Sequence, residues 1–177
     1  MARWRTPSRI FLVGPMGAGK STVGRELADL LGLAFVDSDA EVERRTGVGI
    51  PWIFDLEGEQ GFRARESAVL DELTARDGVV LATGGGAVTV AANRDLLGAR
   101  GVVAYLYTPV SVQLQRTRGD ADRPLLQDSD PEARLQALME ARDPLYRAVA
   151  DTVVEAAGGR ARRVAQRIAE MLQGEGA

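Results

Sequence analysis

Residues 14–21 read GPMGAGKS and directly follow the apolar run Ile10–Val13. They fit the pattern G-x-x-x-x-G-K-[ST] at its fixed positions, Gly14, Gly19, Lys20 and Ser21. In such a loop the glycines let backbone N–H groups turn toward phosphate oxygens, and the helix N-terminus that follows adds a partial positive charge. The stretch therefore predicts a loop that binds a nucleoside triphosphate; the alternative is a Gly-rich turn without a ligand.

Lys20 is the only lysine among the 22 Lys and Arg residues of the chain. The chain uses arginine for positive charge everywhere else, which indicates that this site requires a compact ammonium rather than a planar guanidinium. We expect Lys20 to reach the β- and γ-phosphates of the nucleoside triphosphate and the Ser21 hydroxyl to bind Mg²⁺.

The composition limits both the architecture and the chemistry. A chain of 177 residues with 45% hydrophobic residues predicts one domain, residues 1–177, with a sizeable core. The net charge of −3 argues against a nucleic-acid partner. The chain has no cysteine and no histidine, so disulfides, thiolate chemistry and histidine catalysis are excluded. A general base must therefore be a carboxylate or Lys20.

The N-terminal stretch MARWRTPSR precedes only a short apolar run, which is too short for the apolar region of a signal peptide. No stretch is long enough to span a bilayer, so we expect a soluble, cytoplasmic protein with no membrane partner. No sustained apolar seam suggests a dimer, and we expect a monomer.

Apolar runs of strand length alternate with helical patterns along the chain. The predicted strands are Arg9–Val13, Leu33–Val36, Val79–Ala82, Val102–Leu106 and Thr152–Val154, and the predicted helices are Lys20–Leu31, Gln60–Ala75, Pro131–Ala150 and Arg160–Leu172. This alternation predicts an α/β fold with a five-stranded parallel sheet flanked by helices. The polar stretch RGDADRPLLQDSD, residues 118–130, predicts a mobile lid.

Two aspartates end the second predicted strand, in the sequence Phe35-Val36-Asp37-Ser38-Asp39. Residues two apart in a strand point to the same side, so Asp37 and Asp39 could both face a ligand beyond the carboxyl end of the sheet. One carboxylate could hold Mg²⁺ through water while the other accepts a hydroxyl proton. The alternative is that Ser38 or Asp39 simply caps the next helix.

Further motifs follow in a fixed order. They are EGEQGFRARE with Arg63 and Glu66, ATGGGAV with Gly84–Gly86, DRPLL with Arg123, and ARDPLYR with Arg142. Together with GPMGAGKS and DSD they resemble the shikimate kinase family, from Gly14 to Arg147. The resemblance implies a P-loop kinase fold of the nucleoside monophosphate kinase type. It also implies transfer of the γ-phosphoryl group of ATP to the 3-hydroxyl of shikimate, in the pathway to chorismate and the aromatic amino acids.

The resemblance also assigns site residues, within a substrate-binding segment of about residues 38–66. Lys20, Asp39 and Arg123 would be catalytic. Shikimate would contact Asp39, Arg63, Gly84, Gly85, Gly86 and Arg142. ATP would contact Gly17, Ala18, Gly19, Lys20, Ser21, Thr22, Arg116, Arg123 and Arg160. Ser21 and Asp37 would lie on the Mg²⁺ side. The assignment of Arg160 is ambiguous because the segment AAGGRARR offers several arginines.

The residue chemistry fits these assignments. Shikimate is a carboxylate with three hydroxyls, and Arg63 and Arg142 offer two guanidiniums, the group best suited to bind a carboxylate through two hydrogen bonds. Glu66 could either orient Arg63 or form a helix-surface ion pair with it. Two other functions stay open at this stage: a kinase for another polyol acid such as gluconate, and a non-catalytic nucleotide-dependent regulatory module.

Overall fold

A computed structural model describes residues 6–118 and 130–174 of the chain. Its sheet has five parallel strands in the order β2-β3-β1-β4-β5. The strands are β1 (Arg9–Val13), β2 (Ala34–Asp37), β3 (Val79–Ala82), β4 (Val102–Tyr107) and β5 (Thr152–Glu155). Phe11 of β1 pairs with Leu81 of β3 on one side and with Val103 of β4 on the other, so β1 lies in the centre of the sheet.

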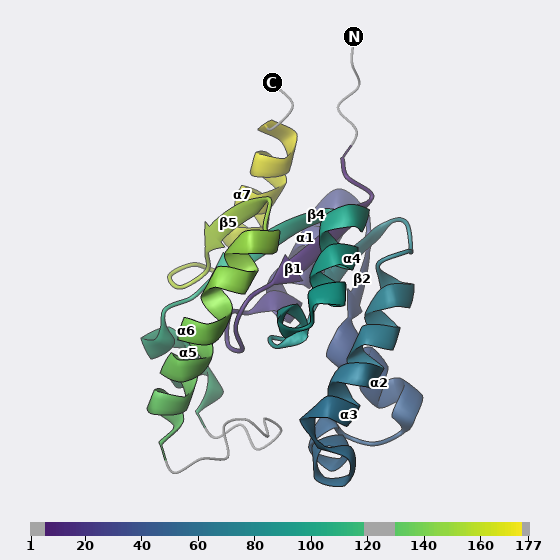
Figure 1. The fold of residues 1–177 in the computed structure, drawn as a ribbon. Helices are drawn as coiled ribbons and strands as arrows, with labels where there is room; N and C mark the ends of the chain where they lie inside the picture. Colours follow the sequence, from purple (N-terminus) through teal and green to yellow (C-terminus); the bar gives the residue numbers. More distant parts are fainter. Residues whose placement is uncertain (1–5, 119–129, 175–177) are drawn as a thin grey trace.

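Helices cover both faces of this sheet (Figure 1). They are α1 (Lys20–Leu31), α2 (Ser38–Thr46), α3 (Ile50–Leu73), α4 (Ala91–Arg100), α5 (Val110–Thr117), α6 (Pro131–Val149) and α7 (Ala161–Gly174), with a 3₁₀ turn at Ala87–Thr89. Phe11 packs in one apolar cluster with residues of α3 and α6, and its neighbour Leu12 packs in the other with residues of α1 and α7. The sheet is therefore the middle of three layers, and β1 is apolar from Ile10 to Val13 because both of its faces are buried there.

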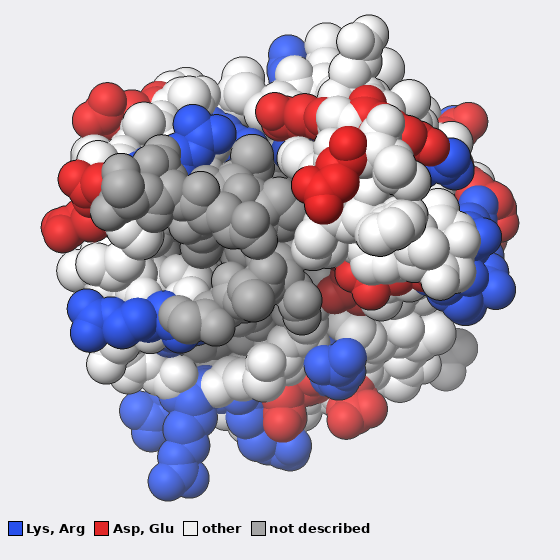
Figure 2. Space-filling model, turned by 90° about the horizontal axis from the view of Figure 1, so that it is seen from below, with Lys and Arg blue, Asp and Glu red and all other residues white. Residues whose placement is uncertain are grey.

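Helices α2 and α3 extend past the sheet on one side of the molecule, and α5 and α6 do so on the other (Figure 1). The surface in Figure 2 carries both basic and acidic side chains on its described part, in keeping with the small net charge. None of the described helices is long and apolar enough to cross a membrane.

The structure differs from the sequence prediction in its helices. Helices α4 and α5 were not predicted, and α3 begins at Ile50 instead of Gln60. The backbone of α3 is not helical at Gly58, where φ is 70° and ψ is −179°, so the helical repeat does not continue through this residue. A single periodic pattern could therefore detect only the second part of α3. The predicted lid, apart from its end residues Arg118 and Asp130, lies outside the described residues.

Candidate active site

Three loops of the candidate site follow the carboxyl ends of three neighbouring strands. GPMGAGKS follows β1, Asp37 ends β2, and the glycine turn Gly84–Gly86 comes two residues after β3. Carboxyl ends of parallel strands meet at one edge of a sheet, where α/β proteins bind their ligands. The sheet topology thus brings the phosphate loop, the aspartates and the glycine turn together.

The phosphate loop has the backbone geometry of an anion site. Gly19 is the N-cap of α1 at φ 81°, and no side chain caps the helix. The first N–H groups of α1 therefore remain available to a ligand. Lys20 is the first residue of α1, and its Nζ donates hydrogen bonds to the carbonyl oxygens of Gly14, at 2.7 Å, and Pro15, at 2.8 Å. The only ammonium side chain of the protein is thus held against the loop.

Asp37 joins the phosphate loop to α2. Its Oδ2 accepts a hydrogen bond from Ser21 Oγ at 2.5 Å, and its Oδ1 accepts from the backbone N–H groups of Asp39, at 2.9 Å, and Ala40, at 3.1 Å. The expectation that Ser38 or Asp39 caps α2 is wrong, because Asp37 is the N-cap. Asp37 can bind Ser21 and cap α2 at the same time, because each of its carboxylate oxygens accepts from a different set of donors.

The side chains of Ser21 and Asp37 fit a magnesium site. Both offer hard oxygen donors, and Mg²⁺ is held in kinases by one or two protein oxygens together with water and phosphate oxygens. Among the described residues there is no group of three or more acidic, His or Cys side chains that could hold a metal by itself. The pair therefore suits an ion that arrives with a phosphate ligand.

Two carboxylates converge on Gly84 at the start of the glycine turn. A Cβ atom at this position would lie 2.6 Å from Glu66 Oε2 and 2.7 Å from Asp39 Oδ1, so only glycine leaves room for them. Ser38 is fully buried, and its Oγ accepts a hydrogen bond from the Gly84 N–H at 3.1 Å. Ser38 is not the helix cap considered from the sequence; its side chain instead connects the segment of the two aspartates to the turn.

Arg63 and Glu66 form a buried pair on α3. Arg63 Nη1 donates to Glu66 Oε1 at 2.8 Å, and the Glu66 side chain has no exposed surface. Burial raises the pKa of the Glu66 carboxyl, although the Arg63 guanidinium acts in the opposite direction. Of the two readings left open for Glu66, the helix-surface ion pair is wrong. A Cβ atom at Gly86 would collide with the Arg63 guanidinium, which therefore lies directly on the turn.

Arg142 of α6 lies near Arg63 and hydrogen-bonds with Tyr146. Arg142 is only 6% exposed. Burial lowers the pKa of the Arg142 guanidinium, and the positive charge of Arg63 lowers it further. One helical turn later, the Tyr146 hydroxyl donates to the Gly85 carbonyl oxygen at 2.5 Å. The structure thus brings together all the described residues predicted to bind shikimate. It adds Tyr146, whose only signal in the sequence is its spacing of four residues from Arg142.

A second part of the site lies beyond the phosphate loop. Arg116 donates to the carbonyl oxygens of Gly17, at 2.9 Å, and Ala156, at 3.0 Å. Beside it is a cavity of about 230 Å³ lined by Ala18, Gly19, Thr22, Val23, Arg116, Ala156, Gly159, Ala161 and Val164. Arg160 lies between two of the lining residues and is exposed. Arg123 lies outside the described residues.

Comparisons with known proteins agree with this geometry. The sequence model of the family described as Shikimate kinase matches residues 16–173. The chain is 80% identical to the shikimate kinase of Halorhodospira halophila, over 99% of both chains. The chain belongs to the shikimate kinase family. The resemblance seen in the motifs is therefore confirmed.

Solved structures of shikimate kinases have the same fold. Shikimate kinase from Acinetobacter baumannii in complex with shikimate is 58% identical and has a TM-score of 0.95, over 97% of this chain and 96% of that chain. The predicted fold class, a five-stranded parallel sheet flanked by helices, is confirmed. A gluconokinase from Sinorhizobium meliloti 1021 is 22% identical with a TM-score of 0.58, and this likeness shows the fold alone.

Proposed function

We propose that this shikimate kinase family member transfers the γ-phosphoryl group of ATP to the 3-hydroxyl of shikimate. The observation that carries the proposal is the set of charged groups around one glycine turn. Two carboxylates, Asp39 and Glu66, converge on Gly84, and the Arg63 guanidinium lies on the same turn. A second buried guanidinium, that of Arg142, interacts with Arg63 and hydrogen-bonds with Tyr146, whose hydroxyl binds this turn. A ligand with a carboxylate at one end and hydroxyls at the other matches this arrangement.

Arg63 and Arg142 bind the shikimate carboxylate in this proposal. Glu66 holds the Arg63 guanidinium from one side, and Tyr146 holds the turn on which this guanidinium rests. Both guanidiniums are largely shielded from water, so their hydrogen bonds to a carboxylate gain from charge assistance. The backbone of Gly84–Gly86 lines the contact because none of its residues carries a side chain.

Asp39 acts at the hydroxyl end. Since the chain has no histidine, a carboxylate next to the phosphate loop is the best placed base. As the 3-hydroxyl oxygen attacks the γ-phosphorus, Asp39 accepts the hydroxyl proton, the bond from this phosphorus to the β–γ bridging oxygen breaks, and ADP leaves. The reaction produces ADP and 3-phosphoshikimate.

The phosphate loop supplies the donors for the other substrate. The N–H groups of residues 17–22 and the Lys20 ammonium bind the β- and γ-phosphates, and Arg116 and Arg160 lie at the adenine end. Ser21 and Asp37 would hold Mg²⁺, which neutralises phosphate charge when it is bound. We assign Arg123, which lies within a lid of about residues 118–130, to the transferring phosphoryl group.

We further propose that residues 1–177 form one domain that acts as a cytoplasmic monomer, with residues 38–66 as its substrate-binding segment. Two apolar clusters share the single sheet and include residues of every strand, which supports one cooperative unit. Sedimentation of the purified protein tests the monomer, and a molecular mass near 18.9 kDa is the expected result.

A coupled assay of ADP release tests the reaction. We expect ADP release with shikimate and none with gluconate, and we expect Asp39→Asn to reduce turnover severely while nucleotide binding persists. ADP release with gluconate alone would favour a kinase for another polyol acid. Nucleotide binding without ADP release, with shikimate and also with gluconate, would favour a regulatory module.

A further inference from the structure

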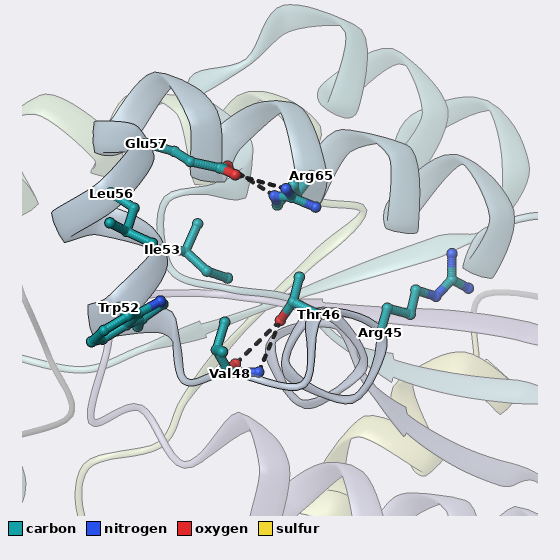
Figure 3. Close-up of a pocket in the computed structure, with 8 residues that line it drawn as sticks. All are labelled: Arg45, Thr46, Val48, Trp52, Ile53, Leu56, Glu57 and Arg65. Atoms are coloured by element: carbon teal, nitrogen blue, oxygen red, sulfur yellow. Dashed lines mark hydrogen bonds and ion pairs between the residues drawn. The ribbon is translucent and has the colours of Figure 1, made fainter.

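An ion pair spans the interruption in α3. Glu57 and Arg65 are eight residues apart and lie on opposite sides of Gly58, where the helical backbone is broken. Arg65 Nε donates to Glu57 Oε2 at 2.8 Å and Arg65 Nη2 donates to Glu57 Oε1 at 2.7 Å. Figure 3 shows the two side chains meeting end to end between the two parts of the helix. Such a two-bonded contact restrains orientation as well as distance.

The neighbouring glycine lets the two parts approach. A Cβ atom at Gly61 would lie 2.4 Å from the Cβ atom of Glu57, far too close for two carbon atoms. Gly61 and Arg65 are four residues apart, so they share one face of the second part of α3. Glu57 therefore lies against that face at Gly61 and is held there by Arg65.

The first part of α3 is otherwise fixed by three apolar side chains, Ile50, Ile53 and Phe54, which pack on the apolar cluster of Phe11. Of residues 50–57, only Ile53 is buried, whereas Trp52 is 57% exposed and Leu56 is 69% exposed. A cavity of about 330 Å³ separates this part from the end of α2, lined by Arg45, Thr46, Val48, Trp52, Ile53, Leu56, Glu57 and Arg65 (Figure 3). Close packing with α2 is thus missing on this side, which increases the importance of a polar restraint.

The first part of α3 also supports the substrate arginine. The ring of Phe54 lies 5.0 Å from the ring of Phe62, measured between centroids, and the Arg63 guanidinium lies 5.2 Å from the centroid of Phe62. A change in the angle between the two parts would move Phe54 and remove the support beneath Phe62 and Arg63. Within the described residues, the ion pair of Glu57 and Arg65 joins these two side chains to each other and not to a residue assigned to shikimate, so we expect its effect to pass through this stack.

We propose that Glu57 and Arg65 are positioning residues, which hold residues 50–57 against the rest of α3 and thereby fix the Arg63 guanidinium for the shikimate carboxylate. The proposal rests on the proposed function, because it assigns the effect to shikimate binding. It predicts a selective consequence: the affinity for shikimate depends on the pair, and the affinity for ATP does not.

Variants of the pair test the proposal by calorimetry and steady-state kinetics. Glu57→Gln and Arg65→Gln should each raise the Kd and the KM for shikimate by about twofold to fivefold, the range of exposed ion pairs. The KM for ATP and kcat at saturation should stay at the parental values. The double variant Glu57→Arg/Arg65→Glu, which restores an ion pair in reverse, should recover most of the affinity. Gly61→Ala should weaken shikimate binding further, because it forces the two parts of α3 apart.

Asp77→Asn serves as the matched control. Asp77 is ion-paired with Arg9 at 2.9 Å at the amino ends of β1 and β3, the opposite edge of the sheet. It should leave shikimate affinity unchanged. Parental shikimate affinity in both single variants, an equal rise in the KM for ATP, or no recovery in the reversed pair would each overturn the proposal. A parent protein without shikimate-dependent ADP release would instead overturn the proposed function.

Discussion

The shape of the Lys20 side chain matters for the phosphate loop as well as its charge. It is the only lysine in the chain, and its ammonium is bound by two carbonyl oxygens of the loop that precedes it. An ammonium donates its hydrogen bonds from one compact centre, which suits a tightly curved loop that also has to admit a phosphate. A guanidinium has a planar fork that does not fit the same space.

We therefore expect Lys20→Ala to abolish turnover while the fold stays intact, since Lys20 is not part of either apolar cluster. Lys20→Arg should also be poor, because it retains the charge but not the shape. ADP release at saturating ATP measures the effect, and far-UV circular dichroism checks the fold. Near-parental turnover of Lys20→Arg would disprove the role of the compact ammonium.

Arg63 and Arg142 carry a second prediction for single residues. Arg63→Ala and Arg142→Ala should each weaken shikimate binding by about 1.5–3 kcal/mol, the range for hydrogen bonds to charged groups. Arg147→Ala is the control, because Arg147 lies on the same helix as Arg142 but is exposed and paired with Asp143 at 2.8 Å. Titration calorimetry with shikimate compares the three variants. Unchanged affinity in both Arg63→Ala and Arg142→Ala would remove these arginines from the site.

Helix α6 connects several functional contacts within one element. Arg142 and Tyr146 share a face of this helix, and the Tyr146 hydroxyl fixes the carbonyl of Gly85. Helix and turn are far apart in the sequence, and this bond joins the glycine turn to the helix that carries Arg142. The buried environment also raises the pKa of Tyr146 to about 12, so its hydroxyl stays a donor at physiological pH.

Tyr146→Phe should lower the free energy of unfolding by about 1–2 kcal/mol and weaken shikimate binding severalfold, because the Gly85 carbonyl loses its donor. Tyr105→Phe is a matched control. It removes a tyrosine hydroxyl bond of 2.6 Å to Asp143 on the same helix and leaves the glycine turn untouched. Urea unfolding and calorimetry separate the two effects. Equal shikimate affinity in both variants would show that Tyr146 serves stability alone.

The charges of the molecule as a whole give a prediction about acid stability. Arg44 and Arg45 bind Glu41 and lower the pKa of its carboxyl to about 2. A pKa below the reference value of 4.5 means that ionised Glu41 stabilises the folded state at neutral pH. This stabilisation is complete above pH 4.5 and is lost as the pH falls toward 2.

Glu41→Gln should therefore lower the free energy of unfolding at pH 7 by about 0.5–1 kcal/mol, as expected for a partly exposed ion pair. The difference from the parent protein should shrink as the pH falls from 4.5 and vanish near pH 2. Urea unfolding across this range measures it. High salt should reduce the difference at pH 7, because salt screens exposed charges. A difference that stays constant with pH would contradict the assignment.

The sequence predicts the strands and the phosphate loop better than it predicts the helices. The central strands β3 and β4 can be predicted because they are buried on both faces and therefore read as continuous apolar runs. The phosphate loop can be predicted because its pattern is local. No apolar periodicity indicates helix α5 (Val110–Thr117), because the helix is short and its two buried residues, Gln113 and Thr117, are polar. The full length of α3 cannot be predicted from apolar periodicity, because Gly58 at positive φ interrupts the helical repeat.

The site divides in the same way. Residues that lie inside a recognisable local motif, such as Ser21 in GPMGAGKS and Asp39 in DSD, can be proposed from the sequence. Ser38 and Tyr146 could not, because their roles depend on bonds to Gly84 and Gly85, which are remote in sequence and adjacent only after folding. The burial of Glu66 likewise depends on how α3 packs against the glycine turn, and no spacing within the motif records it.

Because the Lys20 side chain is hydrogen-bonded to the phosphate loop, proteolytic cleavage after Lys20 can report the local opening of this loop. A protease specific for lysine has a single peptide bond to cut in this chain, between Lys20 and Ser21, in the first turn of α1. Cleavage requires an extended backbone and a released side chain, so it occurs only from a locally opened state. The appearance of two fragments would therefore time the opening of this loop, and any compound that occupies the loop should slow the cut.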